Sequence, residues 1–116
     1  MKKHVLVVFV ICVAIGLTGC SSLAQDGAML RVHTAFEEND FSECLSRISR
    51  AENYGSQSRI MDAQIMFYKA MCLEGVGQIV ASRGVFEGLV RLYPESDWAI
   101  VAESKLLNGE NTGNSF

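Results

Sequence analysis

Residues 58–94, SRIMDAQIMFYKAMCLEGVGQIVASRGVFEGLVRLYP, decide the fold of this chain. Apolar side chains recur there every three or four residues, which is the period of an amphipathic helix, and no alternating run is long enough to predict a strand. The first half is apolar around most of its circumference, so we expect a central helix with neighbours on both sides. GVGQ at 75–78 predicts a turn, and Pro94 predicts the end of the second helix.

The same helical period extends to both sides of this stretch. Asp40 followed by Glu43 resembles a capping box, and Ser58 is placed to cap the central helix. Short loops make successive helices antiparallel, so we expect an all-α chain of helical hairpins. The pattern predicts five helices, at 26–38, 40–53, 58–75, 78–92 and 96–107.

The hairpin of residues 58–94 resembles a tetratricopeptide repeat. The residues that match the small and bulky positions of that repeat are Met66, Ala70, Leu73, Ser82, Phe86 and Pro94. Lys69 departs from the pattern, which has leucine there. In the preceding hairpin Cys44 and Ile48 take the small and aromatic positions, with an insertion at 53–58. The resemblance implies a stack of tetratricopeptide-like hairpins, and a generic five-helix bundle is the alternative.

The first nineteen residues have the composition of a secretory signal. Lys2, Lys3 and His4 form a basic start, and residues 5–17 are almost entirely apolar. This run is shorter than the roughly 20 residues that a membrane-spanning helix needs. We therefore expect it to be removed, and a retained signal anchor with an incidental cysteine is the alternative.

LTGC at residues 17–20 spans the end of the signal and the residue after it, and it resembles the lipobox of bacterial lipoproteins. The resemblance implies that Cys20 receives a diacylglyceryl group, becomes the mature N-terminus and holds the chain to a membrane through fatty acyl chains such as palmitate. Ser21 stands where aspartate would favour the inner membrane, which implies the periplasmic face of the outer membrane. The expected parts are a signal at 1–19, a linker at 20–27, a helical domain at 28–108 and a flexible tail at 109–116.

The charge of the mature chain limits its partners. Loss of Lys2 and Lys3 would leave eight Lys and Arg against thirteen Asp and Glu, a net charge of −5. An acidic body is not attracted to phosphate-rich polymers or anionic head groups. We therefore expect no nucleic-acid partner.

Two cysteines, Cys44 and Cys72, remain once Cys20 carries lipid. An even pair in an oxidising compartment tends to form a disulfide. The two lie at equal distances from residue 58, where the chain reverses, so an antiparallel hairpin places them at the same height. They form a bridge if both side chains point into the contact between the helices expected at 40–53 and 58–75, and otherwise they pack as two buried free thiols.

Catalytic chemistry has few candidates. His33 is the one histidine of the mature chain, and the carboxylates fall mostly on predicted outer faces. We therefore expect no catalytic, cofactor or metal site, and not an enzyme. We expect Tyr93 and Trp98 to be mostly core or half-buried, and because they flank Pro94 they are also candidates for a partner-facing surface.

These observations favour a lipid-anchored module that binds another protein of the bacterial envelope. It resembles the helical-repeat lipoproteins that serve outer-membrane protein assembly, pilus and secretion-channel biogenesis, and polysaccharide export. So few hairpins give only a shallow concave face, which implies that the partner is small or that a second subunit covers the edge of the stack. An oligomer is therefore one of the expected possibilities. The alternatives are a structural lipoprotein and an accessory of a cell-wall or polysaccharide enzyme.

Overall fold

A computed structural model describes the backbone of residues 2–56 and 58–113, and the side chains of 2–10, 24–56 and 58–110. Over these residues the chain is all-α, with no strand. The helices are α1 (Lys2–Glu37), α2 (Phe41–Glu52), α3 (Arg59–Gly75), α4 (Ile79–Leu92) and α5 (Asp97–Gly113).

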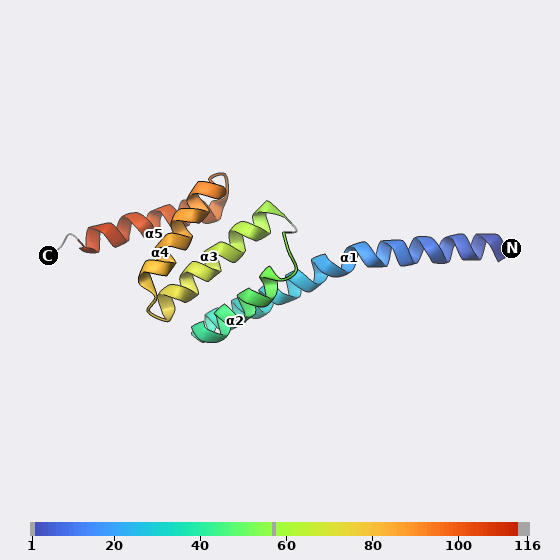
Figure 1. Ribbon diagram of the computed structural model, residues 1–116, viewed down its shortest axis with the longest axis horizontal. Helices are drawn as coiled ribbons and strands as arrows, with labels where there is room; N and C mark the ends of the chain where they lie inside the picture. The colour runs from blue at the N-terminus through green and yellow to red at the C-terminus, as the bar shows by residue number, and fades with distance from the viewer. Residues whose placement is uncertain (1, 57, 114–116) are drawn as a thin grey trace.

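The helices form a stack of antiparallel hairpins. The last part of α1 pairs with α2, and α3 pairs with α4 (Figure 1). Contacts join α1 to α3 and α3 to α5, so one side of the stack is built from the first helix of each hairpin and from α5. The first half of α1 projects away from this stack, which gives the chain a longest dimension of 80 Å.

Local capping groups explain where the helices begin. The Asp40 carboxylate accepts a hydrogen bond from the Glu43 backbone N–H at 3.2 Å, and the Ser58 hydroxyl accepts one from Met61 N–H at 3.1 Å. The Asp40 cap is not reciprocal, because its own N–H donates to the carbonyl of Ala35. Of the predicted capping box only the Asp40 half is present.

Buried side chains form two clusters on opposite sides of α3. One joins α1, α2 and α3, and the other joins α3, α4 and α5. The first contains Met29, Val32, Ala35, Cys44, Ile48, Ala51, Ile65, Tyr68 and Cys72, and the second contains Ala63, Ala70, Phe86, Leu89, Ala99 and Ala102. The prediction that α3 is the central helix is confirmed.

Three of the six positions that match the tetratricopeptide pattern lie buried inside the second hairpin. Ala70, Ser82 and Phe86 are buried, and the Ser82 hydroxyl donates to the Ala70 carbonyl at 2.7 Å. Small residues at these positions let the backbones of α3 and α4 approach closely. Lys69, which departs from the pattern, lies nearer the surface and pairs with Glu52 of the first hairpin at 3.0 Å.

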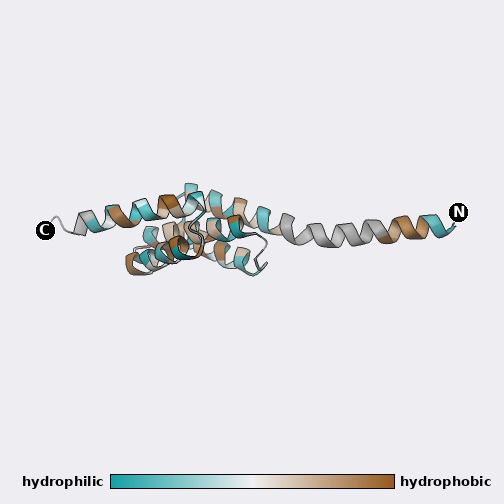
Figure 2. Cartoon of the chain, turned by 90° about the horizontal axis from the view of Figure 1, so that it is seen from above, coloured by the Kyte–Doolittle hydropathy of each residue, from teal (hydrophilic) through white to brown (hydrophobic). Residues whose placement is uncertain are grey.

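Two helix ends differ from the predicted ones. The first helix begins at Lys2 instead of 26, and α5 continues to Gly113 instead of ending at 107, so residues 109–113 of the expected tail are helical. Glu110 pairs with Arg83 of α4 at 2.8 Å, which holds the added turn of α5 against the stack. The apolar residues 5–10 of α1 are 56% to 70% exposed and lie outside both core clusters (Figure 2).

Candidate functional site

A surface groove runs between α1 and α3, on the side of the stack built from the first helices of the hairpins. It combines thioether and aliphatic surface with polar groups that form hydrogen bonds. We call it the α1–α3 groove, and its lining residues are Asp26, Met29, Leu30, His33, Met61, Gln64 and Tyr68. Leu30 is 66% exposed, so it presents an apolar side chain to solvent at this groove.

A chain of hydrogen bonds crosses the groove. The Tyr68 hydroxyl and His33 Nδ1 are 2.8 Å apart, and His33 Nε2 is 3.1 Å from the Glu37 carboxylate. With the ring proton on Nε2, the imidazole donates to Glu37 and accepts from Tyr68, which satisfies both contacts. The carboxylate therefore orients the ring, and the ring connects the two helices.

The surroundings of Tyr68 favour its protonated form. The pKa of Tyr68 is raised above its ordinary value, first by burial and then by the negative charge of Glu37. A protonated phenol is a hydrogen-bond donor and a weak nucleophile. The arrangement is thus suited to holding the groove in one shape and to presenting the half-exposed His33 to a bound partner.

The sequence did not indicate this hydrogen-bonded chain, because His33 and Tyr68 are 35 residues apart and meet only when α1 packs on α3. One signal was available. A tyrosine on a helix that is apolar around most of its circumference brings a hydroxyl that needs a partner when it is buried, and His33 is the one imidazole after Cys20.

The structure joins Cys44 of α2 to Cys72 of α3 by a disulfide, with α carbons 6.3 Å apart. Both residues are fully buried in the first core cluster. The bridge ties the first hairpin to the second. It lies in the same core cluster as Tyr68, which lines the α1–α3 groove. Its role is structural, since neither sulfur reaches the surface.

Tyr93 and Trp98, the candidates for a partner surface, both pack against the core. The Trp98 ring lies 5.0 Å from that of Phe67 and 6.0 Å from that of Tyr68, and it contacts both core clusters. Arg59 lies over the Tyr93 ring, 4.9 Å from its centre. Most contacts of these two aromatic rings are therefore internal, and the α1–α3 groove is the stronger candidate.

The remaining sequence predictions concern lipid, metals and membranes. The side chain of Cys20, the predicted lipidation site, lies outside the described side chains. Among the residues that are described, no group of three or more His, Cys, Asp or Glu could hold a metal ion. Within the same part of the chain, no helix has the length and apolar character needed to cross a membrane.

Comparison with known proteins gives no relative. No family model, no curated protein and no solved structure matches this chain.

Proposed function

We propose that this chain is a lipid-anchored protein-interaction module of the bacterial cell envelope, attached through Cys20 and binding another envelope protein in its α1–α3 groove. The observation that carries the proposal is the groove itself. It offers exposed apolar surface at Leu30 next to an oriented polar group, His33, on a packed helical stack. Binding surfaces of this kind combine an apolar anchor with few, well-placed polar groups.

The anchor is supported by the N-terminal sequence and by the exposure of the apolar segment. A run of Val, Leu and Phe that packs against nothing in the stack is unfavourable in water. Removal of that run at Cys20 and acylation of the new terminus would place the domain at a membrane surface. By the resemblance to lipoproteins with serine after the cysteine, that surface is the periplasmic face of the outer membrane.

A co-purification experiment tests the binding half of the proposal. The chain carries a tag after Phe116 and is isolated from detergent-solubilised membranes. We compare the wild type with Leu30→Lys, which changes the groove, and with Val80→Lys as the matched control. Val80 is 87% exposed on α4, outside the groove, so its substitution alters charge and exposed apolar area in a similar way.

We expect a stoichiometric envelope protein to accompany the wild type and Val80→Lys, and to be lost from Leu30→Lys. Recovery of no such protein with the wild type would contradict the proposal. Full retention by Leu30→Lys would refute the assignment of the groove as the binding surface.

A further inference from the structure

Three arginines gather on the opposite side of α1 from the groove. They line a hollow of about 350 Å³ between α1 and α2, together with small residues of α1 and the ring of Tyr54. We call this set the arginine patch, and its members are Arg31, Arg47 and Arg50. Gly27 and Ala28 are among the small residues that line the hollow, and its volume is large enough for an anion.

The patch holds charge that the rest of the domain does not neutralise. Five of the eight Lys and Arg after Cys20 form ion pairs, and the patch contributes one of them, Arg47 with Glu43. Arg31 and Arg50 form no ion pair with any described side chain. In a body with a net charge of −5, two unpaired arginines and a third beside them create a local positive field.

The nearby carboxylates are directed elsewhere. Glu52 pairs with Lys69 of α3 at 3.0 Å, and Asp26 lines the α1–α3 groove instead of the hollow. Glu43 pairs with Arg47 and offsets one of the three charges. The patch therefore retains positive charge and differs from the acidic average of the chain.

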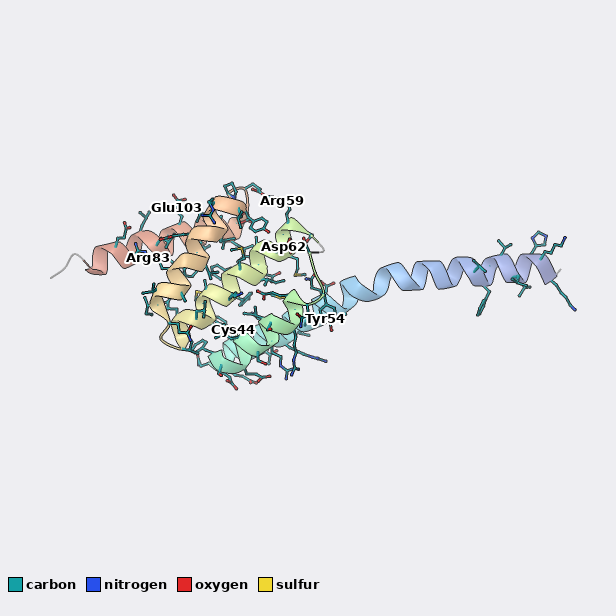
Figure 3. The ribbon with its side chains drawn as sticks, in the orientation of Figure 1. Cys44, Tyr54, Arg59, Asp62, Arg83 and Glu103 are labelled. Carbon is teal, nitrogen blue, oxygen red and sulfur yellow. A yellow bond between two sulfur atoms is a disulfide. The ribbon has the colours of Figure 1, made fainter. Side chains whose placement is uncertain are left out.

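The patch also lies at the end of the domain that faces the proposed anchor. The Gln25 side-chain amide is buried and donates to the carbonyl of Gly55 at 3.1 Å, which fixes the end of α2 beside residue 25. Because the α1 backbone is helical from Lys2 to Glu37, residue 25 lies about 8 Å along the axis from Cys20, at 1.5 Å per residue. Tyr54 marks this end of the stack, where α1 meets it (Figure 3).

We propose that the arginine patch binds the phosphate of an anionic phospholipid head group in the membrane to which the chain is anchored, and so holds the domain against that surface in one orientation. The inference rests on the proposed lipid anchor at Cys20. Planar guanidinium groups bind phosphate oxygens through paired N–H donors. From the net charge of the chain we expected no attraction to anionic head groups. At the arginine patch the local positive charge decides binding instead.

The test uses the lipidated chain, purified from membranes and reconstituted into nanodiscs of phosphatidylcholine alone or mixed with phosphatidylglycerol. Exposed arginines are modified with phenylglyoxal, and each site is quantified by peptide mass spectrometry. Arg91 is the matched internal control, because it is exposed, forms no ion pair among the described side chains and lies on α4 outside the patch.

We expect Arg31 and Arg50 to react at least about fivefold more slowly in the phosphatidylglycerol discs, which is the effect of one basic residue at an anionic surface. Arg91 should react equally in both discs, and high salt should abolish the protection. In the double variant Arg31→Gln with Arg50→Gln, the protection of Arg47 should be lost, whereas Arg91→Gln should keep it.

Three outcomes would overturn the inference. Equal reactivity of Arg31 and Arg50 in both discs, with the chain still co-eluting with them, refutes lipid binding and leaves the anchor intact. Protection by millimolar inorganic phosphate in phosphatidylcholine discs, as strong as that by phosphatidylglycerol, assigns the hollow to a free anion instead. Failure of the purified chain to co-elute with either disc refutes the anchor, and the inference with it.

Discussion

Gly75, the last residue of α3, offers a sharp test of how the two hairpins pack. A Cβ atom at this position would lie 2.3 Å from Cγ of Phe41, and 2.4 and 2.6 Å from its two Cδ atoms. These atoms form the base of the ring, so the whole side chain must move. Phe41 packs against the first core cluster and lies 6.0 Å from the Phe36 ring, so moving it disturbs further contacts.

The magnitude follows from a matched comparison with Gly84 in α4, where an added Cβ has no atom within 4 Å. Replacing glycine by alanine within a helix stabilises it by about 0.5–1 kcal/mol. Gly84→Ala should show that gain. Gly75→Ala has at most the same gain, from which the overpacking cost of about 1–3 kcal/mol is subtracted. We therefore expect Gly75→Ala to be less stable than Gly84→Ala by about 1–3 kcal/mol.

Urea unfolding followed by circular dichroism and by the fluorescence of the single tryptophan, Trp98, measures both variants. In a Phe41→Ala background the cost at Gly75 should disappear, which makes the double-mutant cycle strongly coupled. The packing of Phe41 on α3 would be wrong if Gly75→Ala were as stable as Gly84→Ala.

Three further predictions follow from the core and the groove. Phe86→Ala should destabilise the fold by about 3–5 kcal/mol because it leaves a cavity, and Ala70→Leu by about 1–3 kcal/mol because it overpacks the core. Urea unfolding measures both variants, and unchanged midpoints would place these side chains outside the core. Peptide mass spectrometry of the unreduced protein should find Cys44 linked to Cys72, whereas two thiols open to alkylation after denaturation would refute the bridge. Because burial and Glu37 raise the pKa of Tyr68 in the fold, the free energy of unfolding should be unaffected by this group below pH 10.0 and should fall above it. Tyr68→Phe should flatten that fall, and an identical alkaline profile would contradict the burial of the Tyr68 hydroxyl beside Glu37.

Much of the fold could be predicted from sequence because its signals are local. Helical periodicity, the caps at Asp40 and Ser58 and the turn around Gly77 act within a few residues, and helices α2 to α4 begin and end within a residue or so of the predictions. Gly77, at φ +86°, supplies the left-handed residue that the turn after α3 requires.

What could not be predicted depends on how helices face one another. The His33–Tyr68 hydrogen bond requires the register of α1 against α3, and the extension of α5 depends on the pairing of Glu110 with Arg83 of another helix. The sequence indicates Trp98, which flanks Pro94, as a candidate for a partner-facing surface, whereas the direction of α5 turns its ring onto Phe67.

The arginine patch illustrates the same limit for function. Arg31 comes from α1, and Arg47 and Arg50 come from α2, so the cluster exists only once these helices pair. In the sequence these residues are spread among acidic ones, and their sum with the rest of the chain is negative. Composition describes the average charge of a domain, and packing decides where the charges meet.

The attachment at Cys20 is the claim on which both proposals depend, and intact-mass and N-terminal peptide spectrometry of the chain isolated from bacterial membranes tests it most directly. We predict a chain that begins at Cys20 and carries the added mass of a diacylglyceryl group with its fatty acyl chains, and a Cys20→Ala variant that lacks both the processing and the added mass. A membrane-bound chain that still begins at Met1, with Cys20 as a free thiol, would contradict the account.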